Sequence, residues 1–147
     1  IFIIMYANRI KNILKENLNK EYSDSRMKSL RDFNKWCQDY LGLVDLPKIS
    51  LTSDKSKTTT YGHNDIVNDV VVVYMGNRSL GDIMRSLAHE LIHYQQKQNG
   101  KLQFDGTDGI TGSDIENEAN SVAGVIMREY GQNNPHIFES TLKTFQV

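Results

Sequence analysis

The sequence predicts an α+β fold in a single domain that spans residues 1–147. Helical periodicity dominates residues 1–45, a β-branched run occupies residues 70–75, and two capped amphipathic segments follow. A chain of this length can bury enough apolar surface to form one core. We therefore expect a small mixed or antiparallel sheet that packs on the helix of residues 79–99, with helices before and after it.

The N-terminal part is predicted to hold two helices. Apolar side chains recur at helical spacing over residues 5–18 and again over residues 25–40. Ser23 and Asp24 offer a cap for the second helix, and Gly42 offers its end.

The sheet is expected in residues 46–78. Residues 48–52 alternate in polarity and are rich in β-formers, and residues 58–61 are a weaker candidate strand. Residues 62–65 have turn composition. The valine run at residues 70–75 is the most secure strand.

A capped helix is predicted over residues 79–99. Ser79 and Asp82 form a start that resembles a capping box, and Gly100 is a natural stop. The apolar stripe of this helix consists of Ile83, Met84, Leu87, Ala88 and Leu91. His89 and His93 fall on roughly the opposite side from this stripe.

These two histidines belong to the motif H-E-L-I-H at residues 89–93. Residues four apart on a helix lie on one face, so both imidazoles can reach one zinc ion. Glu90 then lies beside the metal, where it can take a proton from a water whose pKa zinc has lowered to about 7. The motif predicts a metal site, while two chance surface histidines would be the alternative.

A second capped helix is predicted over residues 113–131. Ser113 or Asp114 provides the cap and Gly131 the stop. Pro135 begins a short final helix through Phe145. A polar, glycine-rich loop joins the two capped helices and is expected to line a cleft.

The third metal ligand has several candidates. Glu116 could bind zinc while Asn120, four residues later on the same face, hydrogen-bonds a ligand histidine. Glu116 could instead only complete a capping box with its cap residue. Glu118 is a second candidate, and His63 or His136 would make a three-histidine site.

The H-E-L-I-H motif followed by E-N-E-A-N at residues 116–120 resembles the gluzincin metallopeptidases. The chain is most similar to the small ImmA/IrrE-type and minimal gluzincin peptidases. The resemblance implies a zincin-like fold, zinc held by His89, His93 and Glu116, and Glu90 as general base. It also implies a substrate strand that pairs with the sheet edge, which we place at residues 70–75. The longer metzincin motif is absent, because Gln96 stands where its glycine would be.

The predicted activity is hydrolysis of peptide bonds in a peptide or protein substrate. An additional donor would stabilise the oxyanion, and Tyr130 and His136 are the leading candidates, with Tyr94 and His63 as alternatives. Two other functions stay open. One is a structural or assembly protein of a larger complex or particle, such as a virus particle, that retains the fold and metal site. The other is a DNA-associated, SprT-like protease.

Composition and charge limit the partners and the cellular location that we expect for this protein. The net charge of −1 provides no overall basic field for nucleic acid. The apolar run at residues 1–6 is too short to span a bilayer and lacks the features of a signal peptide, so we expect a cytoplasmic or virion-associated protein. This run and the tail at residues 138–147 are candidate docking segments.

Cys37 is the only cysteine and is expected to act as a small buried hydrophobe.

Overall fold

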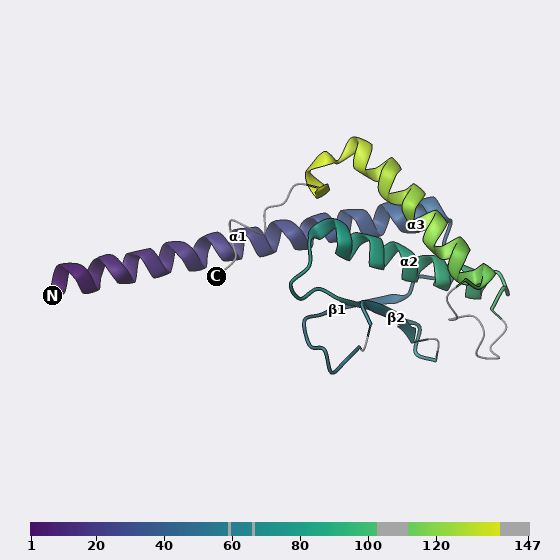
Figure 1. Ribbon diagram of the computed structural model, residues 1–147, viewed down its shortest axis with the longest axis horizontal. Coiled ribbons are helices and arrows are strands. Elements are labelled where there is room, and N and C mark those ends of the chain that lie inside the picture. Colours follow the sequence, from purple (N-terminus) through teal and green to yellow (C-terminus); the bar gives the residue numbers. More distant parts are fainter. Residues whose placement is uncertain (59, 66, 103–111, 139–147) are drawn as a thin grey trace.

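The computed structural model describes residues 1–58, 60–65, 67–102 and 112–138, apart from the side chains of Leu18, Asn19 and Tyr22. It confirms the mixed α+β class, with a small three-stranded sheet and helices before and after it (Figure 1). The elements in chain order are α1 (Phe2–Leu41), β1 (Lys48–Thr52), β2 (Gly62–Asp65), β3 (Val70–Tyr74), α2 (Leu80–Gln98), α3 (Asp114–Asn133) and the 3₁₀ helix η1 (Pro135–Phe138).

The sheet is mixed and has the order β1-β3-β2. β1 pairs parallel with β3, and β2 pairs antiparallel with it. The central position of β3 explains its valine run, because both of its edges are paired and alternate side chains are fully buried. It also shows that placing the substrate strand against residues 70–75 was wrong, since the free edges belong to β1 and β2.

The second strand lies where we predicted a turn. Residues 58, 60 and 61 are outside any strand, and residues 62–65 form β2 instead. Glycine, asparagine and aspartate have low intrinsic β-propensity, so local composition argued against this strand. Pairing with β3, for example His63 opposite Val72, outweighs that preference.

The two predicted N-terminal helices are one continuous helix, α1. The chain has no glycine or proline before Gly42, so nothing interrupts the backbone hydrogen bonds at Ser23 and Asp24. Gly42 ends α1 as predicted, with φ 63° and ψ 38° in the left-handed region.

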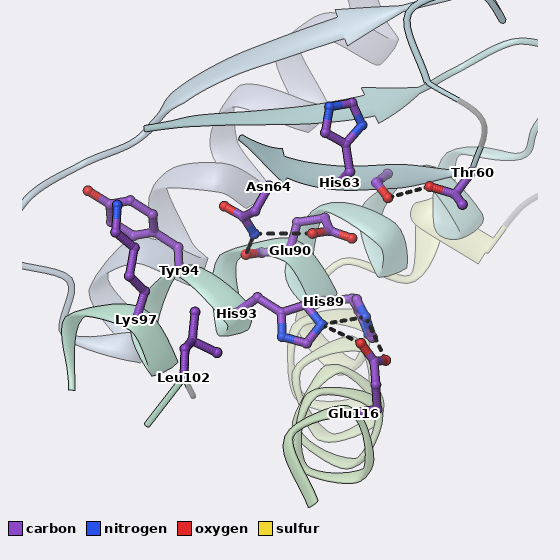
Figure 2. A pocket seen from close by; sticks show the side chains of 11 residues that line it. Thr60, His63, Asn64, His89, Glu90, His93, Tyr94, Lys97, Leu102 and Glu116 are labelled. Atoms are coloured by element: carbon purple, nitrogen blue, oxygen red, sulfur yellow. Dashed lines mark hydrogen bonds and ion pairs between the residues drawn. The ribbon is translucent and has the colours of Figure 1, made fainter. Parts of the chain in front are cut away.

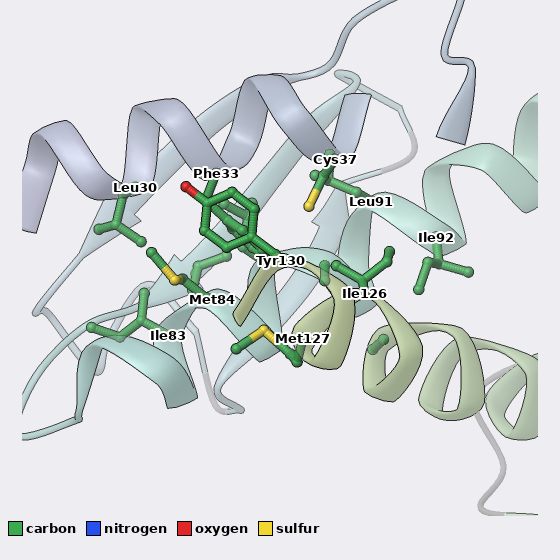
Figure 3. Packing of buried hydrophobic residues seen from close by; sticks show 14 of the residues in the cluster. Leu30, Phe33, Cys37, Ile83, Met84, Leu91, Ile92, Ile126, Met127 and Tyr130 are labelled. Atoms are coloured by element: carbon green, nitrogen blue, oxygen red, sulfur yellow. The ribbon is translucent and has the colours of Figure 1, made fainter. Parts of the chain in front are cut away.

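Helix α2 lies at the centre of the fold and contacts α1, α3 and the sheet (Figure 1). The Ser79 hydroxyl accepts a hydrogen bond from the Asp82 N–H at 3.2 Å, which confirms the predicted cap. All five residues of the predicted apolar stripe are buried. Figure 3 shows three of them, Ile83, Met84 and Leu91, within the core. They join a core in which Phe33 of α1 meets Tyr130 of α3 edge to face at 4.9 Å. Cys37 is fully buried in the same core.

Helix α3 starts at the predicted cap, where Ser113 Oγ accepts the N–H of Glu116 at 3.3 Å. It continues past Gly131 to Asn133, so the predicted stop was wrong. Gly131 instead allows the ring of Phe138 to pack against the helix, because a Cβ there would collide with that ring. Among the described residues, no helix is long and apolar enough to cross a membrane. The final helix is seen only as Pro135–Phe138, and the rest of its predicted length lies outside the described residues.

Candidate metal centre

Three predicted ligands meet beside α2. His93 Nε2 lies 3.0 Å from His89 Nε2 and 2.9 Å from Glu116 Oε1, and His89 Nε2 lies 3.3 Å from Glu116 Oε2 (Figure 2). The two histidines come from adjacent turns of α2, and Glu116 comes from the first turn of α3. Among the described residues, only these three form a group of histidine, cysteine or acidic side chains whose ligand atoms could hold one ion.

These separations fit a tetrahedral metal. With ligand bonds of about 2.0–2.1 Å, neighbouring ligands of a tetrahedral zinc ion are about 3.3 Å apart. The three observed separations of 2.9–3.3 Å are close to this value. Two imidazoles and one carboxylate also form the donor set of hydrolytic zinc sites that leave a fourth position open.

Gln96 determines which nitrogen of His93 faces the site. His93 Nδ1 lies 2.7 Å from Gln96 Oε1, while Gln96 Nε2 donates to Ile115 O and to Glu118 Oε1, both at 3.1 Å. Both partners of Gln96 Nε2 are hydrogen-bond acceptors, so this atom is the amide nitrogen and Gln96 Oε1 is the amide oxygen. Because Gln96 Oε1 can only accept, His93 Nδ1 must carry a proton. In the neutral imidazole, the unprotonated Nε2 of His93 then points at Glu116. A cation between these two acceptors would satisfy both.

His89 has its own support on α3. The side chain of Asn120, four residues after Glu116 on α3, lies close enough to His89 to raise the pKa of its imidazole. Burial lowers the pKa of His89, and the nearby His93 lowers it further, although Glu116 and Asn120 act in the opposite direction. Burial thus favours the neutral imidazole, which is the form that binds metals.

Glu90 lies next to the ligands and is buried, with 7% of its surface exposed. Burial raises its pKa to about 7, since a charged carboxylate loses hydration there. Asn64 of β2 donates from Nδ2 to both the Glu90 carbonyl oxygen at 2.7 Å and its Oε2 at 3.1 Å. The second of these hydrogen bonds holds the carboxyl, and the two together join the edge strand to α2.

Gly62 allows β2 to approach α2 closely. A Cβ at this position would lie 3.1 Å from Glu90 Cγ and 3.1 Å from the Val72 carbonyl oxygen. Positions 62 and 64 lie on the same face of the strand, because alternate residues of a strand point the same way. The missing side chain of Gly62 thus leaves room for Glu90, which Asn64 then holds.

A cleft of about 410 Å³ opens at this site (Figure 2). Its volume lies within the range of small-ligand and substrate sites. Side chains from β2, α2 and α3 line it, and Leu102 lies at its margin. The lining residues are Thr60, Gly62, His63, Asn64, His89, Glu90, His93, Tyr94, Lys97, Leu102 and Glu116.

Two predicted catalytic residues lie elsewhere. Tyr130 packs in the core, edge to face with Phe33 and Trp36. His136 lies on η1, where its Nε2 is 3.4 Å from Ser29 Oγ of α1. The other two oxyanion candidates, His63 and Tyr94, both line the cleft.

Glu118, the alternative third ligand, is not part of the group that His89, His93 and Glu116 form. It accepts hydrogen bonds from Gln96 and from Lys101 Nζ, the latter at 3.2 Å. Its link to the site is therefore indirect, through the glutamine that holds His93. Most of the glycine-rich loop before α3 lies outside the described residues.

Sequence reasoning overlooked two residues of the site. Asn64 lies in the strand that composition assigned to a turn, and nothing local to it indicates a partner 26 residues away. Gln96 had a detectable signal, because residues three apart on a helix are neighbours and a ligand histidine requires a partner for its second nitrogen.

A scan against models of protein families found no match, and searches of curated proteins and of solved structures found no similar protein.

Proposed function

We propose that this protein is a zinc-dependent peptidase. The observation that carries the proposal is the convergence of His89, His93 and Glu116 in a cleft that a buried carboxyl, Glu90, also lines. These three residues would hold the ion through both Nε2 atoms and the Glu116 carboxylate. When bound, zinc lowers the pKa of a coordinated water to near 7 and polarises a carbonyl group.

Glu90 is the general base in this proposal. It accepts a proton from the attacking water as the water oxygen bonds to the peptide carbonyl carbon, and it later gives this proton to the leaving amine as the C–N bond breaks. A pKa of about 7 suits both transfers at neutral pH. The hydrogen bond from Asn64 keeps the carboxyl oriented during both steps.

The free edge of β2 suits an extended peptide. Tyr74 N donates to Tyr61 O at 2.9 Å, so Tyr61 belongs to a hydrogen-bonded pair of the antiparallel ladder. Pairs alternate along such a ladder, which directs the backbone groups of Gly62 and Asn64 away from β3. A substrate strand that pairs there would run along the cleft beside Glu90.

Two of the oxyanion candidates, His63 and Tyr94, line the cleft. The side chain of His63 lies on the opposite face of β2 from Asn64, because successive side chains of a strand point to opposite faces, and its Nδ1 is 3.0 Å from Thr58 Oγ1 (Figure 2). Tyr94 is therefore the preferred candidate for the oxyanion donor. Separate His63→Gln and Tyr94→Phe variants distinguish the two, since loss of the oxyanion donor lowers kcat by about 10²-fold or more.

The test is cleavage of a mixed peptide library by the zinc-loaded protein, with product termini read by mass spectrometry. Glu90→Gln should retain stoichiometric zinc and lose at least about 10²-fold in rate. His89→Ala should lose the metal as well. Equal cleavage by wild type and Glu90→Gln would refute the proposal. Stoichiometric zinc without turnover of any peptide would favour the assembly protein, and salt-sensitive DNA binding would favour the DNA-associated protease.

A further inference from the structure

The first part of α1 projects away from the rest of the protein (Figure 1). Every described side chain from Ile1 to Ser25 is exposed, and Arg26 is the first that the body of the protein partly covers. At 1.5 Å per residue, this projection is about 37 Å long. A helix without tertiary contacts is only marginally stable in water. Contact with another surface would therefore stabilise this segment.

Apolar side chains are concentrated at the end of the projection. Nine large hydrophobic residues are exposed there by 41–94%: Ile1, Phe2, Ile3, Ile4, Met5, Tyr6, Ile10, Ile13 and Leu14. Six of the nine, all except Ile1, Ile4 and Met5, fall on one stripe about 120° wide at about 100° per residue. Ile4 and Met5 lie off this stripe, so residues 2–6 are apolar on every side of the helix. A continuous apolar surface of this kind indicates an interaction site.

The charges on the same segment have one sign. Arg9, Lys11 and Lys15 are its only charged side chains before Glu16, the first acidic residue of the chain. At 3.6 residues per turn, Arg9 and Lys11 lie about 90° and 110° from the centre of the stripe, on opposite sides. Two cations therefore border the apolar stripe, where their long side chains can reach an aqueous interface.

From this arrangement we propose that residues 2–15 bind the surface of a membrane that contains anionic lipids. The apolar stripe enters the boundary between headgroups and acyl chains, and the flanking cations contact lipid phosphates or carboxylates. Residues 2–6, which are apolar on every side, enter more deeply than the rest of the segment. A second copy of the helix fits less well, because a helix pair buries one stripe from each chain and would leave Ile4 and Met5 in water.

Membrane binding would place the body of the protein beside the bound segment, because α1 is continuous and an interfacial helix lies along the membrane surface. Residues 16–25 are predominantly polar and extend α1 by about 15 Å along this axis. α1 then continues without a break to Leu41 and packs against α2. One continuous helix therefore contains both the proposed membrane-binding residues 2–15 and the part that packs against α2. Membrane binding does not depend on metal or catalysis, so it is separable from the proposed peptidase activity.

Vesicle sedimentation with the full chain tests this proposal. Wild type should sediment with vesicles of phosphatidylcholine plus phosphatidylserine, and added salt should weaken the binding. Ile10→Gln/Ile13→Gln should lower the partition coefficient by about tenfold or more per side chain, while glutamine maintains helix propensity. Lys11→Gln/Lys15→Gln should lower it about 25-fold on the anionic vesicles and leave binding to phosphatidylcholine alone unchanged.

Val44→Ser/Val67→Ser is the matched control, because these two side chains are 88% and 90% exposed but lie outside the projecting segment. It should bind vesicles as wild type does, and circular dichroism should show unchanged helix content in all variants. Absence of wild-type binding to anionic vesicles would overturn the proposal. The proposal would also be overturned, in favour of a second copy, if wild type formed a soluble dimer and bound no vesicles. In that case Ile10→Gln/Ile13→Gln should dissociate the dimer.

Discussion

His93 and Gln96 lie three residues apart on α2, with the ring Nδ1 2.7 Å from the amide Oε1. The amide nitrogen of Gln96 reaches across to Ile115 O and Glu118 at the start of α3. Gln96 is fully buried. One side chain therefore orients a candidate metal ligand and connects the helix that carries two ligands to the helix that carries the third.

Replacing Gln96 should weaken metal binding. In Gln96→Leu the His93 ring loses its acceptor, and we expect the affinity for zinc to fall about 10–100-fold. Competition with a chromophoric chelator measures this affinity. Gln95→Leu is the control, because Gln95 Nε2 donates at 2.7 Å to Leu41 O on α1, away from the metal. Equal losses in both variants would mean that the effect comes from general damage to α2.

Replacing Asn64 should shift the pH dependence of cleavage. The hydrogen bond from Asn64 lowers the pKa of Glu90 and so opposes part of the effect of burial. Asn64→Leu removes this bond, so the acid limb of kcat/KM against pH should move to higher pH. Asn68→Leu is a suitable control, because Asn68 is exposed and its side chain donates to Asp65 Oδ2 at 2.8 Å. An unmoved acid limb in Asn64→Leu would argue against Glu90 as the titrating base.

The buried carboxyl of Glu90 should destabilise the metal-free protein as pH rises. Its pKa is about 7 when folded, against an ordinary value of 4.5. Below pH 4.5 both states are protonated; between pH 4.5 and 7 the unfolded state ionises first, so stability falls; above pH 7 the loss is complete. The shift corresponds to about 3 kcal/mol. Urea unfolding should therefore show Glu90→Gln gaining stability over wild type from pH 5 to pH 8. A pH-independent difference would contradict this, since titration of His89 is common to both proteins.

Two glycine substitutions should have opposite effects. Gly62→Ala places a methyl group against the Val72 carbonyl oxygen, a backbone atom that cannot easily move, and should cost about 1–3 kcal/mol. Gly124→Ala in α3 has only the end of Arg85 near its new Cβ, at 4.0 Å, and should gain about 0.5–1 kcal/mol. Thermal and urea unfolding measure both. Similar destabilisation by the two variants would contradict the close approach of β2 to α2.

Local patterns predicted the helices well. The caps at Ser79 and Ser113 and the apolar stripe of α2 depend on residues within one or two turns, and the structure has all of them. The same locality explains the prediction of Glu116 as a ligand and Asn120 as its companion, since both lie on one helix face. The break predicted at Ser23 and Asp24 failed because a capping residue permits a helix start but does not force one.

The sequence by itself therefore determined the α+β class, the strand at Val70–Tyr74, the helix α2 and the candidate ligand residues on α2 and α3. Only the tertiary structure decided which of them meet. Pairing with β3 made residues 62–65 the edge strand and brought Asn64 to Glu90. Packing against α1 took Tyr130 and His136 away from the cleft. The physical reason is range: caps and periodicity act between near neighbours, whereas these contacts join residues far apart in the chain.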